Sequence, residues 1–261
     1  MNHMDLTDYR VIVTGGASGM GAATVRNYAA AGAQVVSMDI NEGQGREVAE
    51  AATAQGPGRA EFRRLDVSDA AEVTSRFDEA AELLGGLDVL AHPAAIQRSG
   101  DASRVTVEDW DAMFAVNVRG TMLTNQAAHR LMASNQRGSI INFGSISGLR
   151  PEAVAPAYSA SKGAVHSWTR TAAAAWGADG VRVNAILPAI ATPMYDAALE
   201  RLDEEGRTAN YWMNEATIAL GHEYGDPDRD LGPVMVFLAS EASRFITGQL
   251  LPVDGGQTSV R

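Results

Sequence analysis

The chain has 261 residues, 46% of them hydrophobic, and its 21 basic and 32 acidic side chains give a formal net charge of −11 at pH 7. This acidic balance argues against nucleic-acid binding, and no apolar run approaches the ~20 residues that a membrane span needs. The sequence has no cysteine, which excludes disulfides and thiolate metal sites, and its start lacks the apolar segment of a secretory signal. We therefore expect a globular, cytoplasmic protein without a nucleic-acid or membrane partner.

Seven apolar runs rich in β-branched residues predict strands, and Ala-rich segments with helical spacing alternate with them. The expected strands are 11–14, 34–38, 62–65, 87–91, 139–143, 181–187 and 249–253. The expected helices include 20–31, 69–84, 107–135, 157–177 and 229–240. Apolar strands separated by helices are typical of a parallel sheet covered on both faces. We predict an α/β fold of the Rossmann type, a doubly wound seven-stranded parallel sheet in a single domain over residues 1–261.

The first expected strand runs into a glycine-rich turn and then a helix, in VIVTGGASGMGAATV. Glycines let the backbone approach a pyrophosphate, and a helix N-terminus offers free N–H groups to it. The glycine spacing departs from the commoner G-x-G-x-x-G, and a tight strand–helix connection without a ligand would look similar. We predict a dinucleotide site whose first contacts are Gly15, Ser18, Gly19, Met20 and Gly21.

Asp39 lies at the end of the second expected strand and strengthens this prediction. An acid there accepts hydrogen bonds from the adenosine ribose hydroxyls and repels a 2′-phosphate. No basic residue occurs in GGASGMG, and Ile40 follows the acid, so the sequence indicates NAD as cofactor in preference to NADP. After the third expected strand, Asp66 and Val67 are expected to hold the adenine, the carboxylate on its amino group and Val67 against its ring.

Tyr158 and Lys162 lie four residues apart in YSASK, and Lys162 is the only lysine among 21 basic residues. Residues four apart on a helix share a face. A free tyrosine has a pKa of about 10, so acid–base catalysis near neutral pH needs a lower value, which an adjacent ammonium provides. A Tyr/Lys pair on a helix is usually an exposed pair without a catalytic role. A lysine at this position would nevertheless suit a dinucleotide site, because its compact ammonium donates to ribose hydroxyls better than a planar guanidinium does. We interpret the pair as an acid/base and its partner.

Taken together, these motifs resemble the short-chain dehydrogenase/reductase family in its single-domain form. The resemblance covers nearly the whole chain, from TGGASGMG through NVRG, GSISG and YSASK to RFITGQLLPVDGG. It implies that Tyr158 is the catalytic acid/base, that Ser145 binds the substrate oxygen, and that Lys162 lowers the Tyr158 pKa and binds the ribose. It also implies that Asn117 anchors a water in a proton relay. A single Ser or Asn is more often a cap or turn residue, but here the four occur together.

The segment after the fourth expected strand departs from the family, which usually has Asn-Asn-Ala-Gly there. This chain has His92, Pro93, Ala94 and Ala95 instead. Pro93 removes a backbone donor, and Ala95 adds a methyl group near the nicotinamide ribose. We expect His92 to be a structural side chain rather than a catalytic base, and Ala94 to contact the cofactor.

The segment after the sixth expected strand also departs from the family, which usually has Pro-Gly followed by four residues to a threonine. LPAIATPM lacks that glycine and reaches Thr192 one residue sooner. By resemblance this segment wraps the nicotinamide amide. We expect Pro188, Ile190 and Thr192 still to contact the cofactor.

Residues 193–226 interrupt the alternation of strands and helices and mix charged, glycine and aromatic residues. By resemblance they form the family's variable substrate lid. We expect an apolar roof over the substrate, although a neighbouring subunit is an alternative place for the side chains of Tyr195, Tyr211, Trp212, Met213 and Tyr224. No metal is expected, because partners at metal-ligand spacing are missing for His3, His129, His166 and His222.

We expect an NAD-dependent oxidoreductase that interconverts a secondary alcohol and a ketone on a lipophilic small molecule. One alternative is a ketoacyl-thioester reductase, which would prefer NADPH and a basic residue near Asp39. Another is a non-catalytic NAD(H)-binding regulatory protein, which would not need Tyr158 and Lys162. Small residues on the expected helices 107–135 and 157–177, with the C-terminal segment, indicate a homo-oligomer, for which we predict a homotetramer.

Overall fold

Seven parallel strands form one sheet in the order β3-β2-β1-β4-β5-β6-β7, in a computed structural model that describes residues 4–258. The strands are β1 (Arg10–Thr14), β2 (Gln34–Asp39), β3 (Arg59–Arg64), β4 (Val89–His92), β5 (Gly138–Phe143), β6 (Val181–Pro188) and β7 (Leu250–Val253). This confirms the predicted doubly wound α/β fold. The strand order reverses between β1 and β4, where such sheets leave a crevice at the carboxyl ends of the strands.

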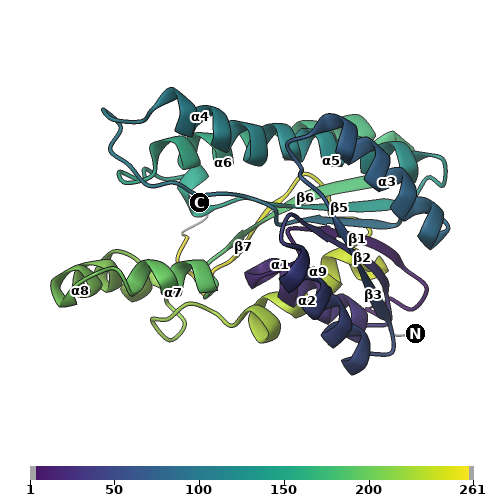
Figure 1. Cartoon of the computed structure of the whole chain (residues 1–261), viewed down its shortest axis with the longest axis horizontal. Helices are drawn as coiled ribbons and strands as arrows, with labels where there is room; N and C mark the ends of the chain where they lie inside the picture. The colour runs from purple at the N-terminus through teal and green to yellow at the C-terminus, as the bar shows by residue number, and fades with distance from the viewer. Residues whose placement is uncertain (1–3, 259–261) are drawn as a thin grey trace.

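Helices cover both faces of the sheet (Figure 1). One face carries α3 (Ala70–Leu84), α4 (Val107–Met113), α5 (Gly120–Ala133) and α6 (Pro156–Trp176), and the other carries α1 (Gly19–Ala30), α2 (Glu42–Gln55) and α9 (Gly232–Ala239). Successive strand residues point to opposite faces, so each strand contributes side chains to the buried layers on both faces of the sheet. On β1, Val11 and Val13 join one buried cluster and Ile12 joins the other.

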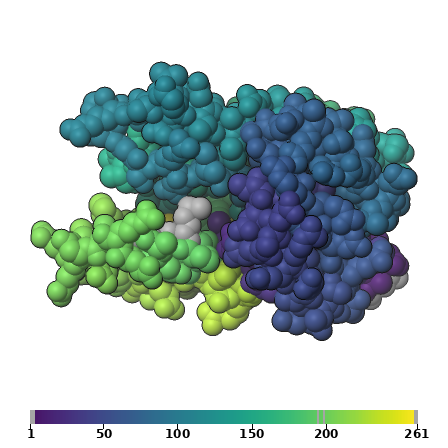
Figure 2. Space-filling model, viewed as in Figure 1, coloured from purple at the N-terminus to yellow at the C-terminus, as the bar shows by residue number. Residues whose placement is uncertain are grey.

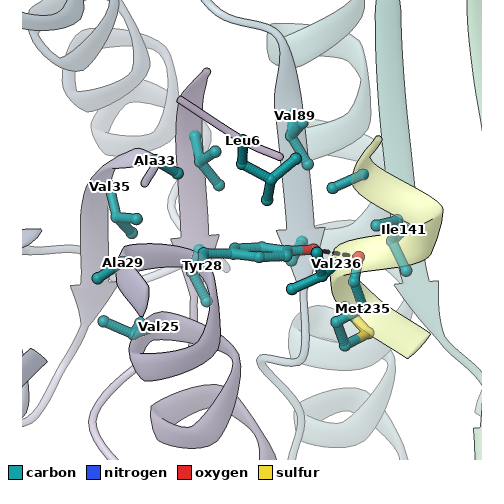
Figure 3. Close-up of a cluster of buried hydrophobic side chains, with 14 of the residues drawn as sticks. Leu6, Val25, Tyr28, Ala29, Ala33, Val35, Val89, Ile141, Met235 and Val236 are labelled. Atoms are coloured by element: carbon teal, nitrogen blue, oxygen red, sulfur yellow. Dashed lines mark hydrogen bonds between the residues drawn. The ribbon is translucent and has the colours of Figure 1, made fainter. Parts of the chain in front are cut away.

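Tyr28 anchors α1 between the sheet and α9 (Figure 3). Its ring is fully buried among Leu6, Val89 and Val236, and its hydroxyl donates to the carbonyl of Met235 at 3.3 Å. A buried hydroxyl with a partner avoids the cost of an unsatisfied polar group. The contact holds α1 against the sheet, with its N-terminus at the crevice.

The expected helix 107–135 is interrupted by a π-helical turn. Between α4 and α5, residues Phe114–Arg119 form this turn, and the amide of Gly120 donates to the carbonyl of Ala115, five residues back. π-Turns inside α-helices are frequent at functional sites. Asn117 lies within the turn, so its side chain leaves the helix at a position that a regular α-helix would not give it.

Residues 193–226 contain α7 (Pro193–Leu199) and α8 (Glu204–Met213), which project beside the rest of the molecule (Figure 1). Figure 2 shows them in green, separated by a furrow from the layer of α4. A second π-turn, Pro227–Leu231, leads into α9, and short 3₁₀ turns lie at Ile146–Gly148, Gly177–Asp179, Glu215–Thr217 and Glu241–Ser243. Within residues 4–258, every helix is too short or too polar to cross a membrane.

Candidate active site

A pocket of about 470 Å³ opens at the carboxyl ends of the central strands. Every residue predicted to bind the cofactor lines it: Gly15, Ser18, Gly19, Met20, Gly21, Asp39, Ile40, Asp66, Val67, Ala94, Tyr158, Lys162, Pro188, Ile190 and Thr192. Ser145 lines it as well. The structure therefore brings together predicted residues from seven separate chain segments. The lining also includes residues that the sequence analysis did not assign to the site, among them Ile96, Gln97 and Val116.

The glycine-rich turn forms one wall of the pocket. Gly15 has φ +65°, and a Cβ on it would lie 2.7 Å from the backbone of Ala94. A Cβ on Gly21 would lie 1.9 Å from the carbonyl oxygen of Gly15, so neither position accepts a side chain. Ser18 precedes α1, and its side chain does not cap the helix. The free N–H groups of this helix N-terminus suit a diphosphate.

Asp39 is held in place at the end of β2 by two backbone amides. Its carboxylate accepts hydrogen bonds from Ala17 at 3.1 Å and from Asn41 at 3.0 Å. Asp66, further along the same wall, accepts from the amide and hydroxyl of Ser68, and the hydroxyl bond lowers the pKa of its carboxyl group. Hydrogen bonds therefore fix the orientation of both carboxyl groups in the wall of the pocket.

Tyr158 and Lys162 face the end of β5 from the first turns of α6. The Lys162 ammonium donates to the carbonyl of Phe143 at 2.8 Å and lies 5.5 Å from the centroid of the Tyr158 ring. The Ser145 side chain is hydrogen-bonded to Tyr158. Three of the four predicted catalytic residues therefore meet at one point of the pocket.

Burial dominates the protonation of this pair. It raises the pKa of Tyr158 to about 12, and the hydrogen bond with Ser145 offsets only part of the rise. Burial also lowers the pKa of Lys162 to about 8. In the protein alone, burial keeps the Tyr158 pKa above its ordinary value, so the lowered pKa that the sequence led us to expect is not reached.

Asn117 is buried beside the pocket rather than in its lining. Its side chain accepts from the amide of Ile96 at 2.8 Å, and donates to the carbonyl of the same residue and to Ser161 Oγ. Ser161 Oγ in turn donates to the carbonyl of Tyr158 at 2.7 Å. These contacts tie the segment after β4 to the start of α6, and the relay role of Asn117 stays a prediction.

His92, at the end of β4, makes structural contacts. It is 2% exposed, and its Nδ1 lies 2.7 Å from the hydroxyl of Thr14 and 3.2 Å from that of Thr124. Burial lowers its pKa to about 3, so the ring is neutral. These contacts match the structural role expected for His92.

The shortened segment after β6 is held by backbone hydrogen bonds on both sides. The amide of Ala189 donates to Val253, that of Ala191 donates to Gly225, and that of Gly225 donates to Ala189. Thr192 Oγ1 accepts from the amide of Tyr195 at 3.2 Å. The missing residue is therefore compensated by pairing this segment with the last part of 193–226.

The predicted substrate residues do not all meet. Ser145 and Tyr158 line the pocket, but Tyr195 and Trp212 do not. Tyr195 contacts Glu215, Asn210 and the ring of Tyr224, whereas Trp212 is 67% exposed. A substrate role for Tyr195 and Trp212 stays a prediction. Among the described residues no group of three potential metal ligands occurs, and His3 lies outside them.

Comparison with known proteins places this site in a family. The family model described as "Enoyl-(Acyl carrier protein) reductase" matches residues 15–258. The chain is 38% identical over 251 residues to the 2,5-dichloro-2,5-cyclohexadiene-1,4-diol dehydrogenase of Sphingobium indicum, covering 94% of each chain. It is 36% identical over 253 residues to the meso-2,3-butanediol dehydrogenase of Serratia marcescens, covering 95% of this chain and 94% of the relative.

Solved structures with the same fold include named dehydrogenases and reductases. Levodione reductase has a TM-score of 0.89 and 30% identity, over 97% of this chain and 98% of that one. A putative short-chain alcohol dehydrogenase from Sinorhizobium meliloti has a TM-score of 0.89 and 32% identity over 98% of each chain. With the sheet order, the glycine-rich turn and the Ser145–Tyr158–Lys162 arrangement, these matches show that the chain belongs to the short-chain dehydrogenase/reductase family.

Proposed function

We propose that this protein is an NAD-dependent dehydrogenase that interconverts a secondary alcohol and a ketone on a neutral, lipophilic small molecule. The observation that carries the proposal is the single pocket that joins Asp39 and the glycine-rich turn to Ser145, Tyr158 and Lys162. A nicotinamide dinucleotide, when bound, supplies the hydride acceptor or donor for this reaction.

The chain's own residues handle the proton. Ser145 binds the substrate oxygen, and the Tyr158 hydroxyl exchanges a proton with it. For alcohol oxidation the tyrosine must act as a base, so its pKa must fall well below about 12. Each pKa unit corresponds to about 1.4 kcal/mol. With the cofactor bound, two positive charges would favour the tyrosinate: the Lys162 ammonium, 5.5 Å from the centroid of the Tyr158 ring, and the pyridinium of the oxidised nicotinamide.

The preference for NAD rests on the charges around the adenosine end of the pocket. Asp39 is oriented there by two amides, and Lys162 is the only basic residue among those that line the pocket. A 2′-phosphate would therefore meet a carboxylate, and no arginine among the lining residues would be there to bind it.

The substrate class follows from the same pocket and from the relatives. No arginine lines the pocket, so a phosphorylated or carboxylated substrate would lack its usual partner. Relatives are named for a chlorinated cyclohexadienediol, for butanediol and for levodione. We therefore propose a neutral, cyclic or aryl secondary alcohol and its ketone as the substrate pair.

The test is formation of NADH with a panel of secondary cyclic, aryl and vicinal alcohols, repeated with NADP. We expect turnover with NAD for at least one member, and its loss in Tyr158→Phe. Higher kcat/KM with NADP would overturn the cofactor assignment. Reduction of a ketoacyl thioester by NADPH with no alcohol oxidised would favour the reductase alternative. Tight NAD(H) binding with no turnover in either assay would favour a regulatory protein.

A further inference from the structure

His166 lies on α6 two turns after Tyr158, and it is 2% exposed. Residues four apart share a helix face, so Tyr158, Lys162 and His166 form one row. Each of the three contacts the end of β5 and the residues that follow it. Tyr158 meets the Ser145 side chain, Lys162 meets the carbonyl of Phe143, and His166 meets the backbone of Ser145.

His166 contacts Ser145 through a hydrogen bond in which the imidazole is the acceptor. The amide of Ser145 donates to His166 Nε2 at 3.3 Å. The ring fills the space beneath this loop: a Cβ on Gly144 would lie 2.5 Å from Nε2, and one on Gly148 would lie 2.6 Å from Cε1. The imidazole therefore contacts the loop at both of its ends, at positions where only glycine leaves room for it.

The chemistry of the ring fits an acceptor. Because Nε2 accepts from an N–H group, the proton of the neutral ring resides on Nδ1. Burial, with the nearby positive charges of Lys162 and Arg170, lowers the pKa of His166 to about 4. The ring therefore stays neutral at any pH near 7, and the acceptor is always available.

We infer that His166 is a positioning residue that holds the backbone of Ser145 so that its hydroxyl meets Tyr158 and the substrate oxygen. The inference rests on the proposed function, in which Ser145 binds that oxygen. The Ser145 hydroxyl also accepts from the amide of Ser147 at 3.1 Å, so its direction depends on the same short loop. A displacement of about 1 Å in a reacting group can cost about 10²-fold in rate.

The first test compares two substitutions at this position with a matched control. His166→Leu keeps apolar bulk but removes the acceptor, and we expect kcat to fall about 10- to 100-fold with little change in the Kd for NAD. His166→Gln supplies an amide oxygen as acceptor and should retain more of kcat. The control is Thr169→Val on the next turn, which removes a hydrogen bond from Asn142 at 3.1 Å without touching the loop. We expect its kcat to change less than about twofold.

The second test asks whether His166 acts through Ser145. In a Ser145→Ala background, adding His166→Leu should cost less than about threefold in kcat, because the group being positioned is gone. If the two losses multiply in full, His166 acts independently of Ser145 and the inference is wrong. If the leucine variant does not fold, His166→Asn repeats the cycle, since its shorter side chain falls short of the Ser145 amide.

A third measurement separates this inference from the proposed function. Amide hydrogen exchange of residues 144–149 needs no substrate, and it should be faster in His166→Leu than in the wild type and unchanged in Thr169→Val. If the wild type oxidises no alcohol, the proposed function fails and exchange alone decides whether His166 holds the loop. If exchange of this loop is the same in His166→Leu as in the wild type, the inference is overturned whatever the activity.

Discussion

Lys162 carries two tasks at once, a charge beside Tyr158 and a hydrogen bond to the carbonyl of Phe143. Arginine preserves the charge, but its planar guanidinium is too bulky for a fully enclosed position that is 4% exposed. We therefore expect Lys162→Arg to lose about two to four orders of magnitude in kcat/KM. The acidic limb of the pH–rate profile should move to higher pH, because the tyrosinate loses its nearest stabilising charge. Near-normal turnover with an unmoved profile would contradict this role.

The same lysine should cost stability. Burial lowers its pKa to about 8 from an ordinary value of 10.5, so between these values the native chain binds fewer protons than the unfolded chain. Stability then rises with pH across this window, and below about pH 8 the native state carries the full cost of the buried charge, roughly 3 kcal/mol. A substitution that removes the buried charge also removes the hydrogen bond from Lys162 to the carbonyl of Phe143, and this loss offsets part of the gain in stability.

We expect Lys162→Met to raise the free energy of unfolding by about 1 kcal/mol at pH 7. Because the wild type sheds the penalty as the lysine deprotonates, this gain should shrink as the pH rises from about 8 towards 10.5. Chemical denaturation at several pH values measures it. If the difference in the free energy of unfolding between Lys162→Met and the wild type stays constant over that range, burial does not lower the pKa of Lys162.

Asp39 governs the choice of cofactor in our proposal. Asp39→Ala removes two charge-assisted hydrogen bonds to the ribose and the repulsion of a 2′-phosphate. We expect kcat/KM for NAD to fall about 10- to 100-fold and the ratio of NAD to NADP to move towards one. Asp66→Asn is the matched control, because the adenine is common to both cofactors. This control should lower kcat/KM for NAD and for NADP alike, without changing their ratio. An unchanged ratio in Asp39→Ala would remove the basis for assigning NAD.

Sequence reasoning placed most site residues because motif residues at strand ends converge in a parallel sheet. The cofactor residues and the Ser145–Tyr158–Lys162 group all line one pocket. The pKa of Tyr158 could not be predicted, since it depends on burial that only the folded chain creates. The contact of His166 with Ser145 also escaped prediction. Its spacing from Lys162 was the available signal, but a histidine on a buried helix face has many structural explanations.

At the scale of elements, α2 packs on β3 through a glycine. A Cβ on Gly45 would lie 2.0 Å from the ring of Phe62, whereas one on Gly43 would have no neighbour closer than 3.9 Å. Alanine is normally the better helix former. We expect Gly45→Ala nevertheless to lower the free energy of unfolding by about 1–3 kcal/mol, because the ring and the helix must separate. Gly43→Ala, the control on the same helix, should leave it unchanged or raise it by up to about 1 kcal/mol. Equal effects in denaturant melts would contradict this packing.

Most strands were predictable because buried parallel strands are continuous apolar runs. The exception is β3 (RAEFRR), which alternates exposed and buried residues and begins three residues before the run predicted for it. The π-turn at Phe114–Arg119 was not predictable from the sequence, because one added residue within a turn leaves the apolar spacing of the helix on either side nearly intact. Helix α2 has only three buried residues, Gly45, Ala49 and Ala52, so its pattern is weak. Residues 193–226 have no strand partner apart from the bridge at Gly225, and their arrangement could not be read from periodicity.

At the scale of the whole molecule, several apolar groups are exposed on the described chain, and two of them lie on surfaces suited to subunit contacts. A hollow of about 880 Å³ on the helical face of α4, α5 and α6 is lined mostly by apolar side chains, among them Ala115, Val118, Met122 and Trp168, together with Asp111, Arg119 and Thr121. On another part of the molecule, Phe245, just before β7, is fully exposed. Exposed apolar patches mark interaction sites, and a tetramer with three two-fold axes needs at least two different interfaces. The two surfaces therefore support the predicted homotetramer.

We expect light scattering to give about four times the chain mass of 27.5 kDa at micromolar concentrations. Met122→Arg and Phe245→Arg each place a charge in one of the two surfaces, so each should reduce the assembly to dimers, and the double variant should reduce it to monomers. Leu83→Arg on α3, where the leucine is already 42% exposed, is the control and should leave the mass unchanged. A wild-type mass near 27.5 kDa would contradict the tetramer. A mass of twice that value, lowered by Met122→Arg alone, would instead assign a dimer to the face of α4, α5 and α6.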